Sequence, residues 1–232
     1  PHEVASLRRA AHAVDRIAAQ LQGGEIALVG RTEAQVSAEI SRRLLDEGHQ
    51  RVNFAIVAAG PNSASPHHEP GDRVIGRGEV VLCDFGGTML DDWGVGYCSD
   101  ITRCVVTAGP SARQSEIYEV LFAAQSVGVG AGGPGVPCQQ VDRATRAVID
   151  DAGLGAHFMH RTGHGIGVEE HEDPYIVEGN AEALVAGNAY SVEPGIYLSG
   201  EFGFRLEDIV VVTADGAESI TVADRALAVV DA

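Results

Sequence analysis

Apolar residues recur every three or four positions near the start of the chain. Such a repeat gathers them on one face of a helix, so it predicts an amphipathic helix over residues 4–21. Thr32 followed by Gln35 has the form of a capping box, which predicts a second helix that runs to about Glu47, where Gly48 ends it. The same rules predict two further helices, over residues 111–129 and 137–151.

Short apolar runs bounded by glycine, proline and polar residues predict the strands. The first half has three, over residues 51–60, 79–87 and 97–109. A turn-rich stretch with Asp91, Asp92 and Gly94 joins the last two. In the second half "HFMHRTGHGIG", "AYSVEPGIY" and "RLEDIVVVT" are expected to be extended. Both halves therefore read helix, helix, strand, loop, strand, which is consistent with an internal duplication. Without a low-complexity linker, we expect residues 1–232 to form one domain.

Composition narrows the class of protein and its partners. Hydrophobic residues make up 45% of the 232 positions, and no apolar run approaches the roughly 20 residues of a membrane span, so we expect a soluble globular protein. The formal net charge of -17 argues against a nucleic acid or an anionic membrane as partner. The four cysteines form no C-x-x-C pair and no segment has a signal-peptide layout, so reduced thiols and a cytoplasmic location are expected.

Four carboxylates occur where apolar strands meet glycine, proline or another polar residue. Each one alone is explained as an ordinary strand-end or turn residue. If they converge in one cavity they repel one another, and two divalent cations would balance their charge. Oxygen ligands with one imidazole suit manganese, cobalt, zinc or iron, and paired metals activate water, which favours hydrolysis. The four acids are Asp84, Asp100, Glu193 and Glu207.

The stretch "HRTGHGIGVEEHEDP" places His160 and His164 four residues apart, the spacing of two metal ligands on a helix. A helix would have to accommodate three glycines here, each at a cost of about 1 kcal/mol relative to alanine. No Glu follows His160, as the helical zinc motif requires. An extended segment also puts both histidines on one face, so that interpretation is preferred.

Taken together, these motifs resemble those of the pita-bread metallopeptidases, the family of methionine aminopeptidase, aminopeptidase P and prolidase. The resemblance spans nearly the whole chain. It rests on "PNSASPHH", "DFGG…GYCSDITR", "HRTGHGIGVEEHEDP", "SVEPGIY" and "RLEDIVVVT" in the family's order. The "GYCSDITR" and "RLED" forms are similar to the proline-specific branch. The resemblance implies an α+β pita-bread fold, with two pseudo-symmetric halves and a curved antiparallel sheet flanked by helices.

The resemblance also implies roles for individual residues. Glu193 would serve as general base or proton shuttle for a metal-bound water that acts as nucleophile. His67, His160 and His171 would line the substrate pocket and assist catalysis there, with Arg205 and Tyr197 on the proline side. The metal ligands would be Asp84, Asp100, His164, Glu193 and Glu207, with Asp100 and Glu207 bridging two ions, manganese first and cobalt or zinc as alternatives.

The implied activity is a dinuclear exopeptidase that cleaves Xaa-Pro bonds, as a prolidase-like dipeptidase or an aminopeptidase P-like enzyme. Its partner would be a small peptide with proline in second position, and a homodimer is left open. Two alternatives share the fold: a non-catalytic binding protein and a metal-free amidinohydrolase of the creatine-hydrolysing type. The complete ligand set counts against both.

Two departures from the family pattern bear on these assignments. Asp84 and Asp100 lie sixteen positions apart, more than is usual, and a longer hairpin turn accounts for the excess. Asp91 or Asp92 would be the ligand in place of Asp84 if that interpretation fails. Proline-specific relatives also carry an N-terminal domain, which this sequence lacks, so we expect either an isolated catalytic domain or a naturally short member.

Overall fold

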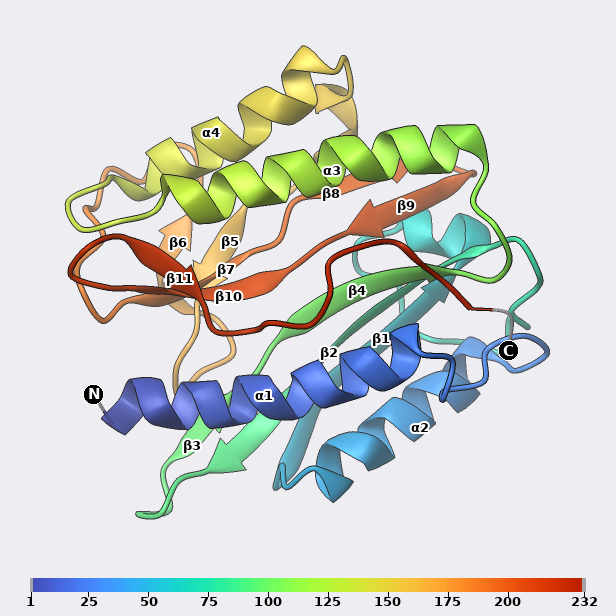
Figure 1. The fold of residues 1–232 in the computed structure, drawn as a ribbon, viewed down its shortest axis with the longest axis horizontal. Helices are drawn as coiled ribbons and strands as arrows, with labels where there is room; N and C mark the ends of the chain where they lie inside the picture. Colours follow the sequence, from blue (N-terminus) through green and yellow to red (C-terminus); the bar gives the residue numbers. More distant parts are fainter. Residues whose placement is uncertain (1, 231–232) are drawn as a thin grey trace.

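The computed structural model describes residues 2–230, whose strands lie between two pairs of helices (Figure 1). Helices α1 and α2 pack on strands of the first half, and α3 and α4 on strands of the second. None of the helices in the described chain is long and apolar enough to cross a membrane. The helices are α1 (His2–Gln22), α2 (Glu33–Asp46), α3 (Ala112–Ala131) and α4 (Cys138–Asp151), with 3-10 turns η1 (Gly60–Ala64) and η2 (Gly155–His157).

All four predicted helices are confirmed, and two of them, α2 and α3, begin at a capping box. The Thr32 hydroxyl accepts a hydrogen bond from the Gln35 amide at 3.1 Å, and the Gln35 side chain accepts one from the Thr32 amide at 2.9 Å. The chain leaves α2 at Gly48, whose φ of 103° is a conformation that side-chain-bearing residues rarely adopt. Ser111 and Gln114 form the same reciprocal cap at the start of α3.

The strands form two antiparallel sheets and a hairpin. In the first sheet the order is β1 (Arg51–Ala59), β2 (Val80–Leu90), β4 (Ile101–Val106), β12 (Ala228–Val229), with β3 (Gly96–Cys98) paired to β2 and only β12 parallel to its neighbour. In the second it is β11 (Ala217–Ser219), β10 (Asp208–Val212), β7 (Ala189–Val192), β5 (Gly163–Gly165), β6 (Glu172–Ile176). The hairpin is β8 (Gly195–Leu198) with β9 (Phe202–Arg205).

Three segments that the sequence predicts as continuous strands are interrupted at their acidic residue. Asp100 stands between β3 and β4, Glu193 between β7 and β8, and Glu207 between β9 and β10. The prediction of unbroken strands was wrong because the residues on both sides of each break are buried, so the apolar pattern continues across it. The prediction that Asp84 ends a strand was also wrong, because Asp84 lies inside β2.

Two apolar layers hold the helices against the strands. The inner face of α1 and α2, including Ile17, Leu21 and Ile40, packs on Val81 and Phe85 of β2. Burial of each such side chain stabilises the fold by about 2 kcal/mol. A second cluster joins α3 to β2, β4, β8 and β9. The helices thus fix the backs of the strands that carry the polar residues.

Candidate metal centre

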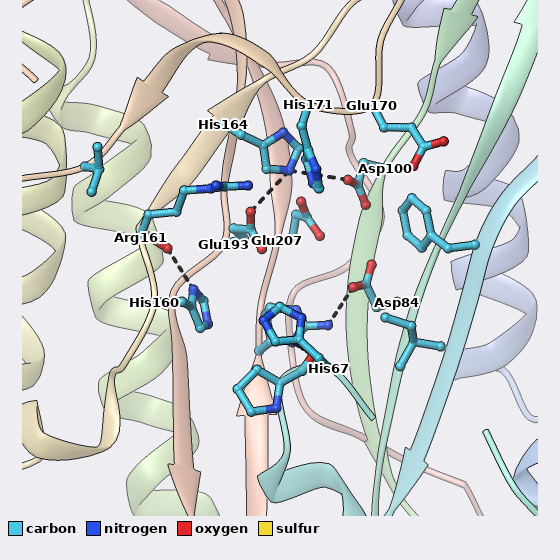
Figure 2. A pocket seen from close by; sticks show the side chains of 15 residues that line it. His67, Asp84, Asp100, His160, Arg161, His164, Glu170, His171, Glu193 and Glu207 are labelled. Carbon is cyan, nitrogen blue, oxygen red and sulfur yellow. Dashed lines mark hydrogen bonds and ion pairs between the residues drawn. The ribbon is translucent and has the colours of Figure 1, made fainter. Parts of the chain in front are cut away.

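A cavity of about 460 Å³ is lined by side chains from both halves of the fold (Figure 2). The first half contributes residues of β1, of β2, of the loop after η1 and of the break between β3 and β4. The second contributes residues around β5 and the strand breaks at Glu193 and Glu207. The lining comprises Phe54, Ile56, Pro66, His67, Asp84, Asp100, His160, Arg161, His164, Glu170, His171, Val177, Glu193, Arg205 and Glu207. All five predicted metal ligands are therefore in one place.

The strand register explains how distant acids meet. Asp84 on β2 lies opposite Ile56 of β1 and Thr102 of β4, and Asp100 precedes β4 on the same face as Thr102. The Thr102 hydroxyl donates to Glu207 Oε2 at 2.7 Å, and the Glu207 amide donates to the Thr102 carbonyl at 3.3 Å. Thr102 therefore joins the acids of the first half to one acid of the second.

Three carboxylate oxygens in the cavity are buried and lack a hydrogen-bond partner among residues 2–230: Asp84 Oδ1, Asp100 Oδ1 and Glu207 Oε1. Burial and the neighbouring carboxylates raise the pKa values of Asp100 and Glu207 well above their usual range. Buried polar atoms are ordinarily paired, so such a group of unpaired oxygens fits cations as their partners. The donor atoms of Asp100, His164 and Glu207 all lie within 4.8 Å of one another, close enough to hold a metal ion.

His164 is oriented as a metal ligand by its backbone. Its Nδ1 lies 3.0 Å from the Gly165 carbonyl and must donate to it, which leaves Nε2 with a lone pair directed into the cavity. Nε2 is 3.3 Å from Glu193 Oε1 and 3.7 Å from Asp100 Oδ2. Burial alone would raise the pKa of Glu193. A second proton on His164, at Nε2, would be donated to Glu193, and this hydrogen bond with its charge outweighs burial and lowers the pKa of Glu193 to about 2. A metal ion at Nε2 would take the place of that proton.

His160, Tyr197 and Arg205 form a chain of hydrogen bonds that ends at Asp84. His160 Nδ1 donates to the Arg161 carbonyl at 2.7 Å, so Nε2 accepts from the Tyr197 hydroxyl at 2.8 Å. Arg205 donates to the Tyr197 oxygen at 2.9 Å and to Asp84 Oδ2 at 2.5 Å. Both ring nitrogens of His160 are engaged within the protein, although its ring lines the cavity.

His67 and His171 reach the cavity from different elements. In Figure 2 His67 enters from below, and His171 lies beside His164 at the top. The two rings of that pair are 4.0 Å apart, edge to face. Burial, reinforced by His164, lowers the pKa of His171 to about 4, so its imidazole is neutral at pH 7. Tyr197 is not itself in the cavity wall; it stands behind His160 and Arg205.

The alternative ligands Asp91 and Asp92 lie in the turn of the β2–β3 hairpin, outside the cavity lining. Asp91 Oδ1 accepts from the amides of Trp93 and Val95 at 2.9 and 2.8 Å, which is the geometry of a turn. Asp92 is exposed. The geometry therefore favours Asp84, and the extra residues between Asp84 and Asp100 lengthen the hairpin.

Sequence reasoning missed several residues that line the cavity or that hydrogen-bond to its acids. Thr102 and Ser191 each lie two positions from a ligand acid on the same strand face, a signal that period-two alternation offered. Ser191 Oγ donates to Glu193 Oε1 at 3.1 Å and accepts from the His164 amide at 3.0 Å. Arg161 and Glu170 had no comparable signal, because they stand in loops. The other residues missed form the apolar wall: Phe54, Ile56, Pro66 and Val177.

This combination of fold and acid-rich cavity is that of a metallopeptidase, and the chain belongs to metallopeptidase family M24, which it matches over residues 5–214. It is 47% identical to a probable dipeptidase PepE of Mycobacterium bovis over 94% of this chain and 56% of the relative. It is 42% identical to an Xaa-Pro dipeptidase of Lactobacillus helveticus, over 87% of this chain and 54% of the relative.

Among solved structures, the prolidase of Thermococcus sibiricus superposes with a TM-score of 0.93 at 40% identity, covering 98% of this chain and 61% of that one. The predicted pita-bread fold and the proline-specific branch are thereby confirmed. The chain spans little more than half the length of the curated relatives named above.

Proposed function

We propose that this protein is a dinuclear metal-dependent exopeptidase that hydrolyses the bond before proline in small Xaa-Pro peptides. The observation that supports it most is the group of buried, unpaired carboxylate oxygens facing His164 Nε2 in an open cavity. The named relatives, a probable dipeptidase and an Xaa-Pro dipeptidase, point to the same reaction. Manganese as the metal and a cytoplasmic location are parts of this proposal that rest on the sequence alone.

The proposed metal ligands are Asp84, Asp100, His164, Glu193 and Glu207. Two divalent ions held there would activate water at neutral pH and supply positive charge to the substrate carbonyl. The protein's own part is to orient the peptide and move a proton. Glu193, an ionised carboxylate at the cavity wall, would accept a proton from the water and return it to the proline nitrogen as the C–N bond breaks. That nitrogen carries no proton in the peptide.

The histidines divide into two groups in this proposal. His67 and His171 form no hydrogen bonds to other side chains in the described chain, so their nitrogens are available to the substrate. His160 instead holds Tyr197, and through it Arg205, against Asp84. We therefore assign substrate contact to His67 and His171. To His160 we assign the orientation of Asp84, through Tyr197 and Arg205.

Arg161 favours a dipeptide as the substrate over longer peptides. Its guanidinium stands 4.8 Å from the ring centroid of Tyr175 at the cavity wall and has no hydrogen bond or ion pair within residues 2–230. Arg205, the other cation of the cavity, is already bonded to Asp84 and Tyr197. A free arginine suits a carboxylate, such as the C-terminus of an Xaa-Pro dipeptide.

The proposed activity is tested by offering the full-length, metal-loaded protein Ala-Pro, Ala-Pro amide and a tripeptide that begins Ala-Pro, with manganese or cobalt. We expect release of alanine from Ala-Pro. No turnover of any of the three would contradict the proposed function.

The role of Arg161 is tested by Arg161→Ala. It should raise the KM for Ala-Pro about 10- to 100-fold and change the KM for the amide less than about threefold. Only the dipeptide has a C-terminal carboxylate that would lose its charged partner. Arg143→Ala is the matched control, because Arg143 lies on the surface of α4 in a pair with Glu178 and should leave both KM values unchanged. Equal effects of Arg161→Ala on dipeptide and amide would argue against a carboxylate contact and leave the activity itself intact.

A further inference from the structure

The loop that brings His67 to the cavity has little regular structure of its own. It begins with η1 (Gly60–Ala64) and continues through Pro66 and His67 without helix or strand. A loop of this kind stays in one conformation only where other groups bind its backbone and side chains. The position of His67 therefore depends on what holds the loop.

Glu33 is the main such group. Glu33 is the first residue of α2, and yet it is fully buried, at 0% exposure. Oε1 accepts from the Ala59 amide at 2.8 Å and from Asn62 Nδ2 at 3.0 Å. Oε2 accepts from Asn62 Nδ2 at 3.2 Å, lies 2.7 Å from His68 Nε2 and accepts from the Gly71 amide at 3.4 Å. These partners stand on both sides of His67 in the sequence.

The backbone around Glu33 and the strand β9 hold the same loop. The Glu33 amide donates to the Arg73 carbonyl at 3.0 Å, so α2 also fixes the end of the loop. From the opposite side, the Gly203 amide donates to Ser63 Oγ at 2.9 Å, and Arg205 donates to the Pro66 carbonyl at 3.4 Å. The loop is thus held between α2 and β9.

An acidic residue in the first turn of a helix is ordinarily explained by the helix dipole. Such a residue is usually exposed, whereas the side-chain partners of Glu33 all belong to the segment 59–71. A carboxylate can serve donors on both oxygens, which neither an amide nor a hydroxyl can do. We propose that Glu33 is a positioning residue that, with His68, fixes Pro66 and His67 at the cavity wall so that His67 contacts the peptide. This inference rests on the proposed function.

A kinetic double-mutant cycle on the full-length protein tests the inference, with Glu33→Gln, His67→Ala and the double variant assayed on Ala-Pro. Glu33→Gln should lower kcat/KM about 10- to 100-fold, because small displacements of substrate-contacting groups are costly. In the His67→Ala background the same change should cost less than about threefold, since the group that Glu33 positions is already gone. An equal cost in both backgrounds would show that Glu33 acts on the fold in general, and the inference would fail.

Glu79→Gln is the matched control. Glu79 binds Arg73 and the Gly76 amide near the far end of the same loop but has no hydrogen bond to residues 59–71. It should change kcat/KM less than about twofold. If Glu33→Gln does not fold, His68→Gln replaces it in the cycle. His68 is partly exposed, and its substitution removes only one of the hydrogen-bond partners of Glu33.

Amide hydrogen exchange of the metal-free protein gives a readout that needs no activity. Glu33→Gln should speed exchange in the segment 60–71 and leave α1 and α3 unchanged. Unaltered exchange in that segment would contradict the anchoring. An inactive wild-type protein that shows the expected exchange would instead count against the proposed function alone.

Discussion

Asp84 and Asp91 belong to the same hairpin, yet only Asp84 faces the cavity. One oxygen of Asp84 is bound by Arg205 and the other has no partner in the described chain, while Asp91 closes a turn. The sequence already indicated this difference, because Asp84 directly follows an apolar run while Asp91 lies in the turn-rich stretch with Asp92 and Gly94.

Asp84→Asn should remove one metal ligand while preserving shape. We expect a loss of about a thousandfold in kcat/KM and fewer than two ions per chain, since several kcal/mol of charge stabilisation depend on the pair of metals. Asp91→Asn is the control, and it should keep both the metal content and the activity. Metal analysis and Ala-Pro kinetics on the two variants provide the measurement, and the reverse pattern would identify Asp91 as the ligand.

At the scale of elements, the sequence predicted the helices well because their signals are local. Thr32 with Gln35 forms a cap from residues three positions apart. The strand breaks at Asp100, Glu193 and Glu207 depend on contacts with strands far away in the chain, so alternation of apolar residues does not reveal them. The ligand set was proposed from the family resemblance, and the fold supplies the physical reason that these acids face one cavity.

Gly163 in β5 shows how closely the strands must approach for His164 to be in place. A Cβ atom there would lie 1.8 Å from the Ser191 carbonyl of β7. Gly163→Ala should therefore separate β5 from β7, destabilise the protein by about 3 kcal/mol and weaken metal binding at least about tenfold.

Gly130→Ala provides the control for that experiment. Gly130 lies in α3 with nothing within 4 Å of an added Cβ, so alanine there should be neutral or stabilise by up to about 1 kcal/mol. Denaturant unfolding and metal titration of the two variants give the comparison. Wild-type metal affinity in Gly163→Ala would show that the close approach of β5 and β7 is not what orients His164.

His49 joins the end of α2 to the segment before Asp100. Its Nδ1 donates to the Leu44 carbonyl at 3.0 Å, and Nε2 lies 2.8 Å from Ser99 Oγ. Burial lowers the pKa of His49 below its usual 6.5. The charge of the nearby Glu47 raises this pKa by less than burial lowers it, and the charge of Arg16 lowers it further. Its contacts are structural.

A lowered pKa means that the unfolded chain binds a proton at His49 more readily than the folded one. The contribution of His49 to stability is therefore complete above about pH 6.5 and decreases as the pH falls below it. Thermal unfolding between pH 7.5 and 5 should show a smaller loss of Tm in His49→Gln than in the wild type. An identical pH dependence in the two proteins would contradict the lowered pKa.

At the scale of the whole molecule, the cavity exists only where the two halves meet. Asp84 and Asp100 come from the first half, and His164, Glu193 and Glu207 from the second. Metal ions in the cavity would therefore join the halves as well as neutralise the acids. We expect chelation to lower the Tm and added metal to restore it.

We propose that two metal ions in this cavity make the protein an Xaa-Pro peptidase. Titration of the metal-free, full-length protein with manganese, with Ala-Pro hydrolysis followed at each addition, tests it most directly. We predict that activity rises and reaches a plateau at about two ions bound per chain. A protein that binds no metal at saturation, or that binds two ions and leaves Ala-Pro intact, would contradict the account.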